Sequence, residues 1–533
     1  MNNKSLTLYQ QVDKFSQSEV TALYFRSGKI NFRVFCRRID EMASKLYDLG
    51  IRKDQVVSLL APNVPETIIA FYALNKIGAI VALLHPLLPK NVLLSSLLET
   101  KSVVLLLLDA RYNDYKDSLK ESKIPVYFLS AYPDLKPFIK QGFKILYHKD
   151  IKNVDKSHYL YKIPKSTTQF HVNEDPKKPS VYLRSGGTTG KSKTVILNDE
   201  NVSFAGKQSE WILKRKIKGI SMIGVLPLFH GYGLSMGVHA PLMNEAASCL
   251  MISYSGKEIV SKVKKGKLNV LIAVPYLARK LLNNRKLNGP MLKNLYATYV
   301  GADKPEEELF QLFDKKMIDN GSENRLLQGY GLTETVTVNF VNTSTDNRIG
   351  SVGKPLLGVR LRIAGDSDFN KDIGPDNDGI IMISSDGVCL GYLNTPKEKQ
   401  PFHYDYDGTK WLITGDIGHY DKDGYLFFKN RATDVLKIAG YSIFPSDIEM
   451  YANRCPNVKS SAAVYIDSDS HPYVHLFLET DSGVDQDKIK KECLKILQDN
   501  LIRYSVPERI TVLNALPRTE VGKIDKKKLR EVK

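Results

Sequence analysis

The sequence predicts an α/β fold with a large multi-sheet N-terminal region, flanking helices and a small α+β domain at the C-terminus. Three observations support this. Short apolar runs alternate with helical segments, the 533-residue chain is too long for a single hydrophobic core, and the pattern changes after about Asp434. We therefore expect one domain over residues 1–432 and a second over residues 433–533, joined by a short hinge near "KNRATDV".

The first alternation runs from Gln55 to Leu108. Strands are expected at residues 56–60, 79–84 and 102–108, with helices between them at residues 65–76 and 89–100. Gly78 closes the first of these helices, as glycine commonly does at a helix C-terminus. Strand–helix–strand order at this spacing predicts a parallel sheet covered by helices.

A similar alternation follows, and then a different pattern. Further strands are expected at residues 221–227, 247–253, 268–274 and 295–300. Beyond Asp434 we expect short strands at residues 461–466 and 473–479 and an amphipathic helix from Asp485 to about Asn500. This second pattern has the length and the mixture of strands and helix that are typical of a small α+β domain.

The formal charge of +18 is spread along the chain, with local clusters at Lys214–Lys218 and Lys262–Lys267. No aromatic residues are interleaved with these clusters as a nucleic-acid-binding face requires, so we expect no nucleic-acid partner. The longest apolar runs are far shorter than the roughly 18 residues of a membrane helix, which excludes a span and leaves peripheral membrane contact open.

The compartment is expected to be the cytoplasm. "MNNKSLTLYQQ" has no apolar core of a signal peptide. The five cysteines are odd in number and scattered, without a CxxC pair or a histidine cluster, so neither a disulfide framework nor a zinc site is expected.

The stretch "SGGTTGKSK", from Ser185 to Lys193, looks at first like a Walker A phosphate loop. That motif needs Gly where Ser185 stands, and a helix where the β-rich "KTVILN" follows. The composition nevertheless suits phosphate groups: glycines for close backbone approach, Thr188 and Thr189 as donors, and lysines as cations.

Four further stretches carry functional groups. "GLSMG" matches a nucleophile elbow around Ser235, but no strand precedes it, so we interpret it as a chance match. "QGYGLTET" offers Tyr330 to stack on a base, Thr333 to donate to a phosphate and Glu334 to bind Mg²⁺. Asp416, after a Thr-Gly turn, could chelate a ribose diol together with Arg431, and a terminal loop isolates Lys523 in "PRTEVGKID".

The order and spacing of these stretches resemble the adenylate-forming superfamily: acyl- and aryl-CoA ligases, adenylation domains of peptide synthetases, and luciferases. "SGGTTGKSK", "YGLTET", "TGD", "NRATDVLKIAGYSIFPSDIE" and "PRTEVGKID" follow in the superfamily's order, and the resemblance covers the chain from about Leu23 to its end. It implies a mobile C-terminal domain, acyl-AMP formation from a carboxylic acid and Mg-ATP, and transfer of the acyl group to a thiol.

The resemblance also implies a role for each matching residue. Thr188, Thr189, Gly190 and Lys193 would hold the outer phosphates, Thr333 the α-phosphate, Glu334 the Mg²⁺, Gly301, Ala302 and Tyr330 the adenine, Asp416 and Arg431 the ribose, and Gly440 the pantetheine tunnel. Lys523 would bridge the carboxylate and the α-phosphate. The hinge position is Thr433 here, where relatives usually carry Asp or Lys.

The acyl site is implied by "LPLFHGYGL", where His230 occupies the position of a gating histidine. No Asp stands nearby to pair with an α-ammonium group, which favours a fatty or aryl acid over an amino acid. We expect CoA as the acceptor. Two alternatives stay open: a stand-alone enzyme that loads a phosphopantetheinyl carrier protein, and an inactive member that acts as a binding protein.

Overall fold

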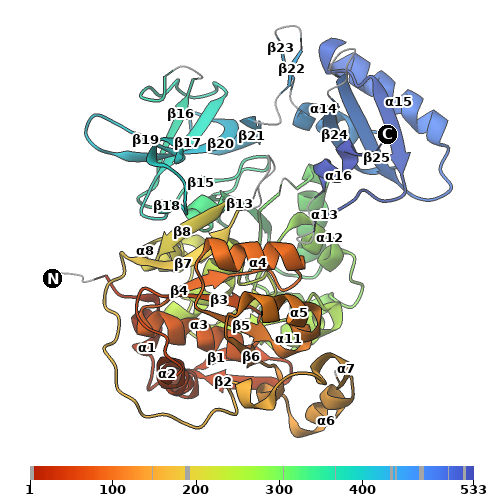
Figure 1. The fold of residues 1–533 in the computed structure, drawn as a ribbon. Coiled ribbons are helices and arrows are strands. Elements are labelled where there is room, and N and C mark those ends of the chain that lie inside the picture. The colour runs from red at the N-terminus through yellow and green to blue at the C-terminus, as the bar shows by residue number, and fades with distance from the viewer. Residues whose placement is uncertain are drawn as a thin grey trace. The chain divides into compact units, whose positions relative to one another are not determined.

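The structure is a computed structural model that describes residues 5–146, 148–185, 193–303, 305–365, 368–432, 436–438, 441–443, 445–466, 473–501, 503–519 and 524–532. The chain divides into two compact units (Figure 1), one comprising Met1–Gly187, Lys191–Arg360 and Ser384–Phe402, the other mainly Leu361–Ile383 and His403–Lys533. Residues 433–435, where the sequence places the domain boundary and the hinge residue Thr433, lie outside the described residues. That boundary stays a prediction.

The first unit contains a nine-stranded sheet that is parallel through its middle. Its strands, in spatial order, are β15 (Lys354–Pro355), β14 (Val338–Val341), β13 (Leu326–Gly331), β12 (Ala297–Val300), β11 (Val270–Ala273), β9 (Ser221–Gly224), β10 (Ala247–Leu250), β1 (Thr21–Phe25) and β2 (Gly28–Asn31). The pairs from β13 to β1 are parallel, whereas β14 and β2 are antiparallel to their neighbours. The carboxyl ends of β9, β11, β12 and β13 therefore meet at one edge.

A second sheet of the same unit has seven strands. In spatial order they are β18 (Gly391–Tyr392), β8 (Thr194–Asn198), β7 (Pro179–Arg184), β4 (Ile80–Leu83), β3 (Val56–Leu60), β5 (Val104–Leu108) and β6 (Val126–Leu129). The strands from β7 to β6 are parallel, and β8 runs antiparallel between β7 and β18.

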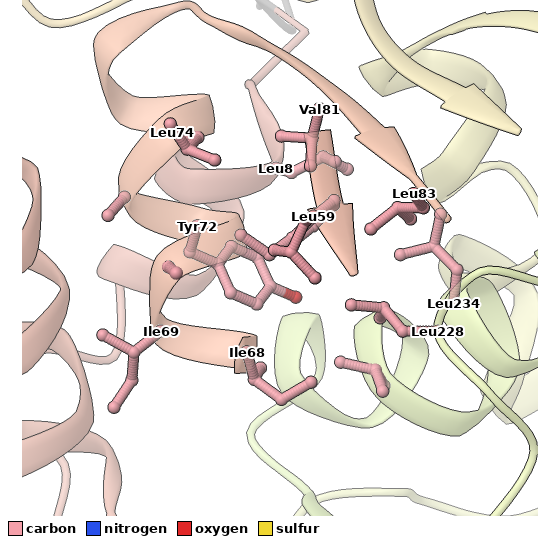
Figure 2. Close-up of a cluster of buried hydrophobic side chains, with 14 of the residues drawn as sticks. Leu8, Leu59, Ile68, Ile69, Tyr72, Leu74, Val81, Leu83, Leu228 and Leu234 are labelled. Carbon is pink, nitrogen blue, oxygen red and sulfur yellow. The ribbon is translucent and has the colours of Figure 1, made fainter. Parts of the chain in front are cut away.

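Helix α3 (Pro65–Ile77) lies in the core between these sheets. It is apolar on all sides, and its residues from Pro65 to Asn75 are buried. Its cluster joins Leu59 and Val81 of the seven-stranded sheet to Leu23 and Leu250 of the nine-stranded sheet. Figure 2 shows Tyr72 of α3 directed towards Leu59, with Leu228 and Leu234 on the same side of the helix. A helix buried all round requires such a double-sided core.

Other helices of this unit flank the sheets. They are α1 (Leu8–Asp13), α2 (Phe32–Asp48), α4 (Lys90–Glu99), α5 (Tyr112–Ser122), α6 (Pro137–Leu146), α7 (His148–Ile151), α8 (Asp199–Ser203), α9 (Ser209–Leu213), α10 (Ala240–Met243), α11 (Gly256–Lys264), α12 (Pro275–Leu282) and α13 (Glu307–Asp319). None of the helices in the described part of the chain is long and apolar enough to cross a membrane.

Three sheets lie in the described part of the second unit. A five-stranded sheet is formed by β16 (Arg360–Ala364), β17 (Gly379–Ser384), β20 (Lys410–Tyr420), β19 (Phe402–Tyr404) and β21 (Leu426–Arg431). β22 (Leu436–Ile438) pairs with β23 (Tyr441–Ile443). The last sheet and its helices are β24 (Val458–Ile466), β25 (Tyr473–Thr480), β26 (Arg509–Leu513), α14 (Pro445–Ala452), α15 (Gln486–Asn500) and α16 (Lys526–Arg530).

The predicted α/β class, and the predicted strands and helices, are confirmed. Each strand expected from an apolar run is present within the expected range, as β3, β4, β5, β9, β10, β11 and β12. The amphipathic helix expected from Asp485 is α15, with the Asp485 carboxylate accepting hydrogen bonds from the backbone N–H groups of Asp487 and Lys488.

Candidate active site

Hydrogen bonds between Ser185 and Lys193 join the two ends of the loop between β7 and β8. The backbone N–H of Ser185 donates to the Lys193 carbonyl at 2.8 Å, and the N–H of Lys193 donates to the Ser185 hydroxyl at 3.2 Å. Thr188, Thr189 and Gly190 lie outside the described residues. β8 begins at Thr194, so a strand stands where a Walker A loop would need a helix.

Helix α4 anchors both strands that carry this loop. The guanidinium of Arg184, the last residue of β7, lies 3.5 Å from a carboxylate oxygen of Glu99. The hydroxyl of Thr194, the first residue of β8, donates to the other oxygen at 2.8 Å. One carboxylate on α4 therefore ties the two ends of the loop together, which fixes where the loop begins.

Glu334 is joined to the end of this loop through Tyr392. The hydroxyl of Tyr392 on β18 donates to Glu334 Oε1 at 2.8 Å, and the Lys193 ammonium lies 4.4 Å from the centre of the Tyr392 ring. Tyr392 is in place because β18 pairs with β8, with Tyr392 opposite Val195. The half-buried carboxylate of Glu334, the phenol of Tyr392 and the ammonium of Lys193 thus form one cluster of side chains within the first unit.

The turn that carries Glu334 is tightly wound. Thr333–Thr335 form one turn of 3₁₀ helix after β13, and the Thr335 hydroxyl accepts from the backbone N–H of Leu332 at 3.0 Å. Val336 then adopts φ 59° and ψ −54°, a conformation that β-branched residues rarely adopt. Such strain persists only where the surroundings impose it, and it is often found at functional sites.

Two glycines let the backbone close around this turn. A Cβ on Gly231 would lie 1.7 Å from the Val336 carbonyl oxygen, and a Cβ on Gly331 would lie 1.7 Å from that of Thr337. His230, half-buried, immediately precedes Gly231 in the segment that follows β9. The "FHGYG" and "GLTETV" stretches, a hundred residues apart in the sequence, are therefore in direct contact.

We expect Gly231→Ala to lower the thermal unfolding temperature, because its methyl group would overlap the Val336 carbonyl and push apart two packed segments. Overpacking of this kind typically costs about 1–3 kcal/mol. Calorimetry of the purified protein measures the effect. Gly142→Ala is the control, because a Cβ there has no atom within 4 Å among the described residues. Equal unfolding temperatures for Gly231→Ala and wild type would contradict the predicted close contact.

Tyr232, Gly301 and Tyr330 lie at the same carboxyl edge of the nine-stranded sheet. The N–H of Gly301 donates to the Ala273 carbonyl at 3.1 Å, and a Cβ on Gly301 would lie 3.8 Å from the Tyr232 ring. The Tyr232 hydroxyl donates to the Tyr299 carbonyl at 3.4 Å, and burial raises the pKa of Tyr232. Ala302 is exposed with φ 71°. Tyr330, the last residue but one of β13, lies opposite Phe340 of β14.

Asp416 and Arg431 face each other in the second unit. They are directly opposed on β20 and β21, and the Arg431 Nε lies 2.9 Å from Asp416 Oδ1. The Asp416 side chain is 2% exposed and that of Arg431 41%. Asp416 lies within a strand rather than in a turn, next to Gly415, which has a φ of 70°. Gly440 and Lys523 lie outside the described residues.

The Glu334 carboxylate suits a Mg²⁺ ion that arrives with a nucleotide. Within the described residues no three His, Cys, Asp or Glu side chains converge to hold a metal on their own. Mg²⁺ is usually bound by one or two carboxylates, with substrate phosphates and water completing its octahedron. A single half-buried carboxylate at Glu334, beside the end of the loop that the sequence predicts to bind phosphates, fits that arrangement.

The sequence did not predict the contact of Tyr392 with Glu334. Tyr392 stands in "LGYLN", which carries no functional signal, and only the pairing of β18 with β8 brings it to Glu334. Ser235 is buried and donates to the Val202 carbonyl at 2.9 Å, which supports the interpretation of "GLSMG" as a chance match.

Comparison with known proteins finds one family whose profile matches most of the chain. The profile of the family described as AMP-binding enzyme matches residues 9–393. The 2-succinylbenzoate–CoA ligase of Listeria monocytogenes serovar 1/2a is 26% identical over 516 residues, which cover 96% of this chain and 96% of that protein. The long-chain-fatty-acid–CoA ligase of Bacillus subtilis (strain 168) is 26% identical over 524 residues, 96% of this chain and 91% of that protein.

Solved structures share the fold across the whole length. ATP-bound MatB from Rhodopseudomonas palustris superimposes with a TM-score of 0.84 at 20% identity and covers 98% of both chains. The O-succinylbenzoate coenzyme A synthetase of Bacillus subtilis, in complex with ATP and a magnesium ion, superimposes with a TM-score of 0.80 at 21% identity and covers 99% of both chains.

Proposed function

Because this chain belongs to the AMP-binding enzyme family, we propose that it is an AMP-forming acid–CoA ligase that acts on a fatty or aryl carboxylic acid in the cytoplasm. The observation that carries the proposal is the contact of Tyr392 with both Glu334 and Lys193, which joins a carboxylate suited to Mg²⁺ to the end of a phosphate-binding loop. The CoA ligases similar to this chain support the choice of acceptor.

The proposed reaction has two steps. A carboxylate oxygen of the acid attacks the α-phosphorus of ATP, the bond from that phosphorus to the β-phosphate oxygen breaks, and pyrophosphate leaves. The sulfur of CoA, deprotonated, then attacks the acyl carbon, the bond to AMP breaks, and AMP leaves with its electron pair. Such transfers depend on positioning and charge neutralisation rather than on covalent help from the protein.

The residues are proposed to act as follows. Glu334 would hold the magnesium ion that accompanies ATP, and that ion would offset the charge of the phosphates. Thr333 would donate to the α-phosphate. We propose that Thr188, Thr189, Gly190 and Lys193 bind the outer phosphates, Gly301, Ala302 and Tyr330 the adenine, and Asp416 and Arg431 the ribose. His230 would line the acyl site, Gly440 would lie beside the pantetheine, and Lys523 would bind the reacting carboxylate.

An ATP–pyrophosphate exchange assay over a panel of fatty, aryl and amino acids tests this function. Exchange with one class of simple carboxylic acid is expected, followed by AMP release when CoA is added. Absence of exchange with every acid would favour the inactive binding protein. AMP release with a phosphopantetheinylated carrier protein but not with CoA would favour the carrier-loading enzyme.

We expect Tyr392→Phe to raise the Mg²⁺ concentration needed for half-maximal exchange by about 10-fold or more, because loss of a group that orients a metal-binding carboxylate typically has this effect. The ring over which Lys193 lies is retained, so folding should be unchanged. Tyr420→Phe, which removes a hydroxyl donated to the Asp372 carboxylate in the second unit, is the control. An unchanged Mg²⁺ dependence would refute the positioning role of Tyr392.

A further inference from the structure

Basic residues gather at the edge of the nine-stranded sheet opposite to Glu334. Because β9, β10, β11 and β12 are parallel, the loops that precede them lie together at the amino edge. Three of these loops and the adjoining end of α11 carry what we call the basic edge: Lys214, Arg215, Lys216, Lys218, Lys264, Lys265, Lys267 and Lys293. All of these side chains are exposed except Lys267, which is half-buried.

Hydrogen bonds hold these loops side by side. Asn269 Oδ1 accepts from the N–H of Ser221 at 3.0 Å, and its Nδ2 donates to the Asn294 carbonyl at 3.1 Å. The N–H of Gly219 donates to the Glu245 carbonyl at 2.9 Å, which ties the loop before β9 to that before β10. The basic edge is therefore a built platform rather than a set of independent surface lysines.

Aromatic rings support two of its cations. The Arg215 guanidinium lies 3.7 Å from the centre of the Tyr296 ring, and the Lys214 ammonium lies 4.2 Å from that of Trp211. A guanidinium whose face stacks on a ring presents its N–H groups at its rim, where phosphate oxygens can bind in pairs.

Carboxylates neutralise little of this charge. Lys218 pairs with Glu245 at 2.7 Å, whereas in the described part of the chain no ion pair involves any other residue of the basic edge. Two carboxylates lie among these eight cations: Glu245, and Glu210, whose Oε1 accepts from the N–H of Ile217 at 3.3 Å. The charge that remains is strongly positive, and it attracts a surface that carries many negative charges.

The partner that fits is a lipid surface rather than a protein. No large apolar side chain is exposed in residues 214–220, 264–269 and 293–296. The two aromatic rings beside the basic edge, Trp211 and Tyr296, are half-buried beneath Lys214 and Arg215. Protein interfaces usually depend on apolar or aromatic anchors at their centre. Lys/Arg clusters of this size are instead typical of segments that bind anionic phospholipids through charge.

We propose that the basic edge binds the anionic headgroups of a phospholipid membrane, with the carboxyl edge that carries Glu334 directed away from the bilayer. Binding would be reversible and dependent on ionic strength, since the attraction decays within a Debye length of about 8 Å at physiological salt. This inference does not depend on which acid the protein activates.

Sedimentation with vesicles tests the proposal. The full-length protein should bind phosphatidylcholine vesicles that contain phosphatidylserine, release them at high salt, and fail to bind pure phosphatidylcholine. The triple variant Lys214→Glu, Arg215→Glu and Lys216→Glu should bind at least about 100-fold more weakly. The control Lys488→Glu, Lys491→Glu and Lys495→Glu changes the same charge at exposed positions of α15 and should bind like wild type.

Three results would overturn the proposal. The first is absence of binding to anionic vesicles at low salt. The second is equal weakening of binding in both triple variants, which would assign the attraction to net charge. The third is binding of RNA or of an acidic protein through these residues without binding of vesicles. Circular dichroism and thermal unfolding of both variants establish that each is folded. A variant at the basic edge that does not fold is replaced by Lys264→Glu with Lys265→Glu, for which about a 10-fold loss is expected.

Discussion

Glu334→Gln is expected to lower the rate of ATP–pyrophosphate exchange by about 100-fold or more. The substitution keeps an oxygen that can accept from the Tyr392 hydroxyl, so the contact at 2.8 Å and the fold should survive. It removes the negative charge proposed to bind the magnesium ion of Mg-ATP. Loss of one preorganised electrostatic group commonly costs this much of the catalytic rate.

The exchange rate should be measured as a function of Mg²⁺, beside thermal unfolding as the check on folding. Excess Mg²⁺ should restore part of the activity, because the nucleotide phosphates still bind the ion. Glu323→Gln provides the control, since Glu323 is exposed on the loop that precedes β13. A Glu334→Gln enzyme within about threefold of wild type at every Mg²⁺ concentration would rule out the metal-binding role.

The buried strands could be predicted from the sequence because each is a short apolar run that local composition identifies. "VVSLL" and "SVVLLLL" became β3 and β5, which are buried on both faces as parallel strands are. The ends were less predictable. The run from Ser221 was expected to reach Pro227, but β9 ends at Gly224, and the Asn63 amide donates to the Gly224 and Leu226 carbonyls. The local sequence around Gly224 does not indicate that a side chain about 160 residues away binds these carbonyl groups.

The same limit applies to the site. Glu334 and Lys193 are candidates from the sequence alone because motifs of recognisable composition contain them. Tyr392 could not, because its contact with Glu334 depends on β18 pairing with β8 across nearly two hundred residues. Gly231 stood inside a recognised stretch, yet the need for glycine there comes from the Val336 carbonyl, whose position follows from a strained turn.

Lys523→Ala is expected to reduce acyl-AMP formation by about 100-fold or more while leaving thioester formation from supplied acyl-AMP within a few-fold of wild type. We propose that Lys523 offsets charge that develops between the carboxylate and the α-phosphate, which matters only in the first step. Lys523 lies outside the described residues, but the chain on both sides of it is anchored. Arg518 and Ile524 form a β-bridge, and the N–H of Asp525 donates to the Pro517 carbonyl at 2.8 Å.

The two steps must be measured separately, the first by exchange and the second by release of AMP from synthetic acyl-AMP in the presence of CoA. Lys527→Ala, at an exposed position of α16, is the matched control and should behave like wild type in both. Equal loss of both steps would refute a role confined to adenylation. Loss of the second step alone would place Lys523 at the thiol instead. We expect selective loss of the first step. This result follows if the C-terminal domain brings Lys523 to the active site for adenylation only.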